Sequence, residues 1–177
     1  MKLLNVSRTA LVAGVLLAAA AAPRAEITQY KLTAKADPHA DFSKLKTYEW
    51  ELGWIAIDRD AHRHFVEAIN RELAALGFTE GEPGKSDVAV AYYSLRRTDT
   101  DLSWKPPTLE TPPPTYPVGT LIVVMREPGT RRELFTARAD APIDLEPARL
   151  NAIIDDTVGR MFALYPTRRS AQPSSRR

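Results

Sequence analysis

The chain has 177 residues, of which 44% are hydrophobic and 26% are charged. These values are typical of soluble globular proteins, and the length predicts a single folded domain rather than global disorder. The sequence contains no cysteine, which excludes disulfide bonds, thiolate metal sites and the lipid-bearing cysteine of bacterial lipoproteins.

The net positive charge of the chain comes from its two ends. The formal net charge is +2, but residues 1–25 contain three basic residues and no acid, and residues 168–177 contain four arginines. Removing both leaves residues 26–167 with a formal net charge of −5. A mildly acidic domain lacks the basic face that nucleic-acid binding requires. We therefore expect no nucleic-acid partner, and we expect residues 168–177 to form a disordered basic tail.

The N-terminus is typical of a secretory signal peptide. Lys2 and Arg8 precede an uncharged, mostly apolar run over residues 10–22, and small residues follow it. The run is shorter than the roughly 20 apolar residues that span a bilayer. The alternative is a buried N-terminal helix. We expect residues 1–25 to be a signal peptide that is cleaved between Ala21 and Ala25, leaving a periplasmic protein with no stable membrane anchor.

The first part of the mature chain predicts two strands followed by a helix. Apolar and polar side chains alternate over residues 27–34 and 45–52, with turn-forming residues between them. A helix is predicted from Asp58 or Asp60 to Leu76, ended by Gly77. Its apolar stripe recurs at steps of three and four residues, at Phe65, Val66, Ile69, Leu73 and Leu76.

The second part predicts three strands and another helix. The strands cover residues 87–96, 118–127 and 132–141, and the turn-forming run 128–130 joins the last two as a hairpin. The helix follows Glu146, has Pro147 in its first turn and stops at Pro166. We therefore predict that residues 26–167 form one α+β domain. Its mostly antiparallel sheet of about five strands carries two amphipathic helices on one face.

A proline-rich segment interrupts this pattern at residues 98–117. It contains six prolines and predicts either a projecting loop or an extended polyproline segment. Trp104 and Tyr116 bracket the prolines, so we predict that they contact an envelope protein partner there. The alternative is that the prolines merely prevent a long connection from pairing as an edge strand.

Residues 41–50, with the sequence DFSKLKTYEW, closely resemble the opening signature of the domain-of-unknown-function 4136 family. Later landmarks are also similar, at residues 76–78, 86–88, 119–121 and 165–166, so that the resemblance covers roughly residues 28–167. The signature residues, expected to be structural, are Asp41, Phe42, Thr47, Tyr48, Trp50, Gly119 and Leu121. This sequence departs from the family in its missing lipid-bearing cysteine, in Phe135 where tryptophan is usual, and in its proline-rich loop. The resemblance implies a bacterial envelope domain and no catalytic residues.

Few groups of residues in this sequence could form a metal site or an active site. His62 and His64 would point to different sides of a helix, and His39 lies between Asp37 and Asp41, whose carboxylates also suit turns. Nucleophile elbows, phosphate-binding loops and dinucleotide fingerprints are absent from the sequence. We therefore expect no metal, no cofactor and no catalytic activity.

Three functions are compatible with this sequence. The first is a non-catalytic interaction or structural domain of the envelope. The second is a carrier of a small ligand or lipid in a cleft between helices and sheet, which an apolar pocket with convergent polar groups would favour. The third is an enzyme with an unrecognised site, which carboxylates of perturbed pKa clustered near His39 would favour.

Overall fold

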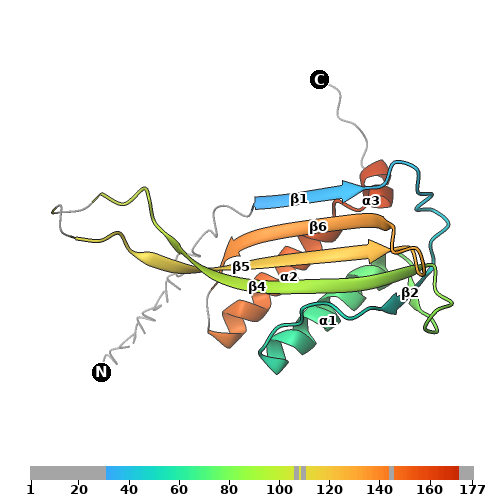
Figure 1. Cartoon of the computed structure of the whole chain (residues 1–177), viewed down its shortest axis with the longest axis horizontal. Helices are drawn as coiled ribbons and strands as arrows, with labels where there is room; N and C mark the ends of the chain where they lie inside the picture. The colour runs from blue at the N-terminus through green and yellow to red at the C-terminus, as the bar shows by residue number, and fades with distance from the viewer. Residues whose placement is uncertain (1–30, 106–107, 109–110, 144–145, 172–177) are drawn as a thin grey trace, which may run out of the picture.

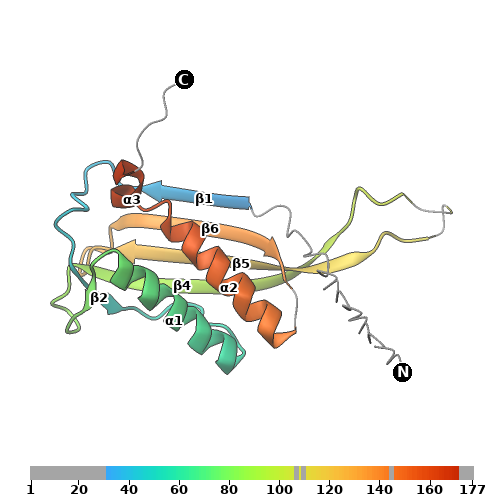
Figure 2. The ribbon, with the colours of Figure 1, turned by 180° about the vertical axis from the view of Figure 1, so that it is seen from behind.

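The computed structural model describes residues 31–105, 108, 111–143 and 146–171, so the predicted signal peptide lies outside the described residues. Within them the chain forms two layers: a six-stranded sheet, and the two longer helices on one of its faces (Figures 1 and 2). The α+β class and the placement of two helices on one face agree with the prediction.

The sheet is mixed and has one strand more than predicted. Its order is β1 (Lys31–Ala36), β6 (Glu133–Pro142), β5 (Thr115–Arg126), β4 (Val88–Thr100), β2 (Thr47–Trp50) and β3 (Thr79–Glu80). The pairs β1/β6, β6/β5 and β5/β4 are antiparallel, whereas β2 is parallel to both β4 and β3. The parallel pairs arise because helix α1 (Arg59–Ala75) returns the chain to the same end of the sheet. The two-residue β3 is too short to leave a sequence pattern.

Both long helices begin where the sequence predicts. Asp58 caps α1, since its Oδ1 accepts the N–H of Ala61 at 2.8 Å, and Gly77 has the left-handed φ of 86° that ends it. Glu146 caps α2 (Pro147–Phe162) by accepting the N–H groups of Ala148 and Arg149.

The C-terminal end of the fold corrects two predictions. Helix α2 ends at Phe162, and Pro166 begins the short α3 (Pro166–Ala171) instead of stopping a helix, because proline suits a first helical turn. Arg168, which we assigned to a disordered tail, lies in α3, and its guanidinium is 2.7 Å from Glu72 of α1. Residues 172–177 lie outside the described residues.

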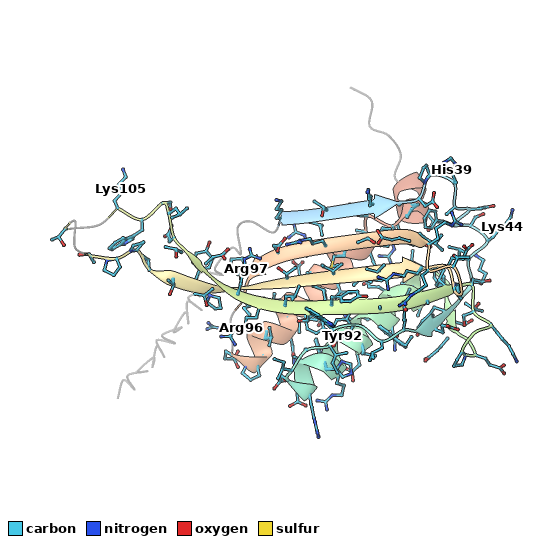
Figure 3. The ribbon with its side chains drawn as sticks, in the orientation of Figure 1. His39, Lys44, Tyr92, Arg96, Arg97 and Lys105 are labelled. Atoms are coloured by element: carbon cyan, nitrogen blue, oxygen red, sulfur yellow. The ribbon has the colours of Figure 1, made fainter. Side chains whose placement is uncertain are left out.

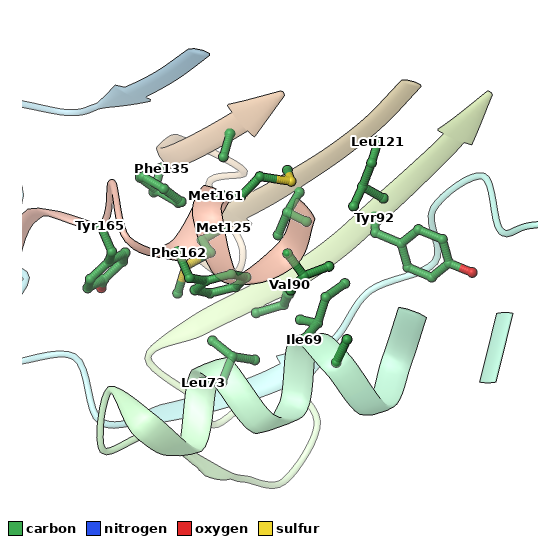
Figure 4. Close-up of a cluster of buried hydrophobic side chains, with 14 of the residues drawn as sticks. Ile69, Leu73, Val90, Tyr92, Leu121, Met125, Phe135, Met161, Phe162 and Tyr165 are labelled. Carbon is green, nitrogen blue, oxygen red and sulfur yellow. The ribbon is translucent and has the colours of Figure 1, made fainter. Parts of the chain in front are cut away.

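The core lies between the helices and the sheet face that they cover. Every second residue of β4, β5 and β6 faces the helices there (Figure 4). Ile69 and Leu73 of α1 and Phe162 of α2 are completely buried against them. Tyr165 packs its ring edge-on against three phenylalanines, Phe42, Phe78 and Phe135.

The proline-rich segment is more regular than predicted. β4 and β5 continue past the other strands as a two-stranded ribbon that projects from the body of the domain (Figure 1). Thr98 pairs with Pro117 and Thr100 with Thr115, so 98–117 is not one long loop. Pro117 is tolerated because its carbonyl accepts the N–H of Ile143, which places the side lacking an N–H away from β4.

Candidate functional site

The helix-facing side chains of the sheet change size from one end to the other. Near the helix C-termini these positions hold Met125 and Phe135, both buried in the core. At the other end of the same strands they hold Gly119, Ala139 and Ala141. The small residues fill less space beneath the helices, so the interface opens where both helices begin.

This opening is a pocket of about 520 Å³, which we call the helix-start pocket. Helices α1 and α2 contribute Ala61, Phe65, Leu150, Ile153, Ile154 and Thr157 to its lining. The strands contribute Ser94, Arg96, Gly119, Leu121, Ala139 and Ala141, and Ile143 follows β6. The lining is therefore mostly aliphatic, with a few polar groups.

An exposed apolar segment leads to the rim of this pocket. Between β2 and α1, Leu52, Trp54 and Ile57 are 86%, 69% and 104% exposed, and Ile57 lines the pocket together with Leu95. The segment is held against β4 because Gly53 lacks a Cβ, which would collide with the carbonyl oxygen of Tyr92. The rim thus presents apolar surface to solvent in a fixed position.

The pocket contains a polar group with no partner. The side-chain oxygen of Thr157 is buried and has no hydrogen-bond partner among the described residues. A buried hydroxyl without a partner destabilises the fold by about 1 kcal/mol or more, so this position of the lining is not optimised for stability. At the pocket's other end, Ser94 and Arg96 continue the helix-facing row of β4.

The uncovered face of the sheet carries a different, mostly charged cluster around Asp140. Asp140 accepts hydrogen bonds from Arg138 at 2.9 Å, from Thr120 at 2.5 Å and from Arg97 at 3.0 Å. The Arg138 guanidinium, helped by Thr120 and Arg97, holds the pKa of Asp140 well below its usual range, against the opposing effect of burial. Because these charges already pair with one another, the cluster has little unsatisfied attraction for a ligand.

In the described part of the chain, the histidines named above lie against tyrosine, carboxylate and turn partners. His62 Nδ1 lies 2.5 Å from the hydroxyl of Tyr92, and His64 Nε2 lies 3.1 Å from Asp155. Near His39, the carboxylate of Asp37 binds Arg132 and the N–H of His39, while Asp41 binds Ser43. Within the described residues, no three histidine or acidic side chains gather as a metal site.

The first signature residues make contacts that hold the fold together. Asp41 forms a turn with Ser43, and Phe42 packs on Tyr165. Thr47 binds Asp87 at the start of β4. The hydroxyl of Tyr48 and the indole N–H of Trp50 both donate to Asn70 Oδ1 of α1, at 2.9 and 3.2 Å.

The last two signature residues lie in the helix-start pocket. Leu121 is buried, and a Cβ at Gly119 would meet Ile143 at 2.8 Å. Sequence reasoning did not identify the pocket itself. The one available signal was the row of small residues on the helix-facing side of β5 and β6, at Gly119, Ala139 and Ala141.

The predicted partner-contact residues lie apart from this pocket. Trp104 is half-buried beyond the end of β4, and Tyr116, on β5, is 37% exposed. Both belong to the projecting ribbon and its connection, as does Leu102, which is 90% exposed. The structure therefore separates two apolar surfaces, one on the ribbon and one at the helix starts.

The fold is similar to that of solved bacterial proteins. A PelC dodecamer from Paraburkholderia phytofirmans is 10% identical with a TM-score of 0.52, and the match covers 76% of this chain and 96% of that one. A second PelC dodecamer from this organism, which carries one substitution, is 10% identical with a TM-score of 0.51, over 76% and 95% of the two chains. A PDZ domain protein from Parabacteroides distasonis ATCC 8503 is 17% identical with a TM-score of 0.50; the match covers 77% of this chain but only 35% of that protein. At these identities the likeness shows the fold alone.

Sequence comparison identifies the family. No curated protein matches the chain significantly. The described helices include none long and apolar enough to cross a membrane. The family described as "Domain of unknown function (DUF4136)" matches residues 33–167, which is most of the chain. The chain therefore belongs to the DUF4136 family, as the resemblance of residues 41–50 led us to expect.

Proposed function

We propose that this chain is a non-catalytic binding domain of the cell envelope that takes up an apolar ligand in the helix-start pocket. The observation that carries the proposal is the pocket of about 520 Å³ at the end of an otherwise closed core. Small-molecule sites typically enclose roughly 300–1,000 Å³ and combine an apolar lining with a few polar groups. The helix-start pocket has both properties, and exposed apolar residues lead into it.

The chemistry of the lining supports binding rather than catalysis. Its hydroxyl groups belong to Ser94, Thr120 and Thr157, and no histidine is among the described lining residues. The hydroxyl of Thr120 is turned to the other sheet face, where it donates to Asp140. Asp58, the acid of the lining, is occupied as the cap of α1. No nucleophile and general base therefore meet in the described lining.

An uncharged fluorescent probe, N-phenyl-1-naphthylamine, tests the proposal. We expect saturable binding to the parent protein, and at least about tenfold weaker binding to Thr157→Met, which fills the pocket, and to Ile57→Asp, which charges its rim. Leu102→Asp is the matched control, because Leu102 is as exposed as Ile57 but lies on the ribbon. Equal affinity in all variants of unchanged thermal stability would refute the proposed site.

A second candidate function is contact with a protein partner through the ribbon. The observation that favours it is the projection of the ribbon from the domain with Leu102 and Tyr116 exposed (Figure 1). Replacing residues 105–115 with a short Gly/Ser linker should then abolish crosslinking to a partner and leave thermal stability unchanged. Retention of every crosslinked partner would rule out contact through residues 105–115, which lie between Trp104 and Tyr116.

A further inference from the structure

A positively charged side chain at the rim of the helix-start pocket indicates which class of ligand the pocket binds. Arg96 and Arg97 are neighbours on β4 at the base of the ribbon (Figure 3). Their side chains lie on opposite faces of the sheet, because successive strand residues alternate. Arg96 therefore lines the pocket, while Arg97 joins the charged cluster on the uncovered face.

The two arginines differ in their partners. Arg97 pairs with Asp99 at 2.8 Å and with Asp140 at 3.0 Å. Arg96 makes no side-chain hydrogen bond or ion pair with any described residue. Most other arginines in the described part of the chain are paired with acids, including Arg126, Arg131, Arg132 and Arg138. An unpaired guanidinium beside an apolar pocket favours a ligand that brings its own negative charge.

The acidic residue of the lining, Asp58, does not neutralise the guanidinium of Arg96. Asp58 is the single acidic residue among the described lining residues, and its Oδ1 accepts the N–H of Ala61 at 2.8 Å. Its negative charge also lies at the positive end of the α1 dipole, which it stabilises. The Asp58 carboxylate is thus committed to the start of the helix, and no ion pair joins it to Arg96.

The types of apolar side chain in the lining indicate the chemical class of the ligand's apolar part. Apart from Phe65, the apolar side chains of the described lining are aliphatic, and they extend from Ile57 at the rim to Ile154 inside. One aromatic ring does not form a platform on which a flat ring system could stack. A flexible hydrocarbon chain suits such an aliphatic lining better.

We propose that the ligand is a single-chain fatty acid, whose hydrocarbon chain occupies the helix-start pocket and whose carboxylate binds the guanidinium of Arg96. This inference rests on the proposed function, since it needs the pocket to bind ligands. It adds the ligand class and assigns Arg96 as the residue that selects for an anionic head group. Arginine suits this role because its planar guanidinium can bind a carboxylate through two parallel hydrogen bonds.

Displacement of N-phenyl-1-naphthylamine by dodecanoate and by dodecanol, both below the concentrations at which they aggregate, tests this assignment. We expect the parent protein to bind dodecanoate about fivefold or more tightly than dodecanol, which corresponds to one partly exposed ion pair. Arg96→Gln should remove this preference and keep dodecanol binding. Arg59→Gln, which removes a nearby arginine outside the described lining, should retain the preference.

The outcomes separate the two proposals. If the probe binds but the parent protein does not distinguish acid from alcohol, or Arg96→Gln preserves the preference, the assignment of Arg96 is wrong and the pocket remains a binding site. If the probe binds but neither chain displaces it, the ligand is not a hydrocarbon chain. Failure of the probe to bind overturns both proposals. Flotation of the protein with vesicles of phosphatidylglycerol, lost in Arg96→Gln, would identify a bilayer head group as the ligand and overturn the single-chain assignment.

Discussion

The two ends of the helix–sheet interface share one architecture but differ in how it is filled. At the end where the helices finish, Met125 and Phe135 of the sheet meet Leu73 and Phe162 of the helices, and all four are essentially inaccessible to solvent. At the end where the helices begin, small residues replace the large ones and a pocket remains. The same sheet therefore supports a closed core at one end and an open pocket at the other, and the difference follows the volume of the side chains on its helix-facing side.

Paired charges occur at both ends of the domain, with Arg126–Glu51 and Arg168–Glu72 at the closed end. The closed end is held by apolar packing around Tyr165. The open end has the Asp140 cluster on the opposite face of the sheet, directly behind the small residues Gly119 and Ala141. We infer that apolar packing dominates the stability of the closed end, and that the Asp140 cluster supports the open end, where the helices bury less apolar surface.

The largest expected effect is at the closed end. Ile69→Asp and Phe162→Asp each place a carboxylate at a position with no solvent exposure, so each should lower the free energy of unfolding by about 3 kcal/mol or more and severely destabilise or unfold the protein. Ile57→Asp at the open end should leave the free energy of unfolding within about 0.5 kcal/mol of the parent value, because Ile57 is fully exposed. Urea unfolding followed by circular dichroism measures all three. Normal stability in either core variant would show that its helix face is not buried.

A smaller effect is expected from acid at the open end. The pKa of Asp140 is lowered in the folded protein, chiefly by Arg138, so its contribution is present above the unfolded pKa of about 3.9 and is lost as pH falls through the folded pKa. Asp140→Asn should therefore cost about 1–2 kcal/mol at pH 7, because the partner arginines are half exposed. Its stability should also fall less steeply below pH 4. If the stability of Asp140→Asn fell as steeply below pH 4 as that of the parent protein, other carboxylates would govern acid unfolding.

The smallest expected changes in the free energy of unfolding come from removing one buried hydroxyl group at each end of the interface. The hydroxyl groups of Tyr165 and Thr157 are both buried without a hydrogen-bond partner among the described residues. Tyr165→Phe and Thr157→Val keep the shape of the side chain, so each should raise the free energy of unfolding by up to about 1 kcal/mol. A loss of stability in Thr157→Val alone would show that its hydroxyl is bonded in solution, to water or to a retained ligand, and would sharpen the distinction between the two ends.

Local chemistry made much of the fold predictable. Asp58 and Glu146 accept backbone N–H groups within three residues of themselves, Gly77 adopts its left-handed φ at a helix end, and Pro147 begins a helix. Each of these features depends on neighbours along the chain, and so does the alternation that marks the strands. The same local reasoning left residues 98–117 as either a projecting loop or an extended polyproline segment, and it did not predict that Thr98 and Thr100 pair with Pro117 and Thr115, because Pro117 turns its missing N–H away from its partner strand.

The sequence by itself determined the two long helices, most of the strands, the α+β class and the family, because periodicity, capping and the run at residues 41–50 are local features of the chain. Only the tertiary structure decided that β2 lies parallel to β4 and that Gly119, Ala139 and Ala141 meet under the starts of two helices. It also decided that Arg96 rather than Arg97 faces that space. These features depend on contacts between residues far apart in sequence and on the volume left unfilled between them. Local sequence patterns contain no information about either.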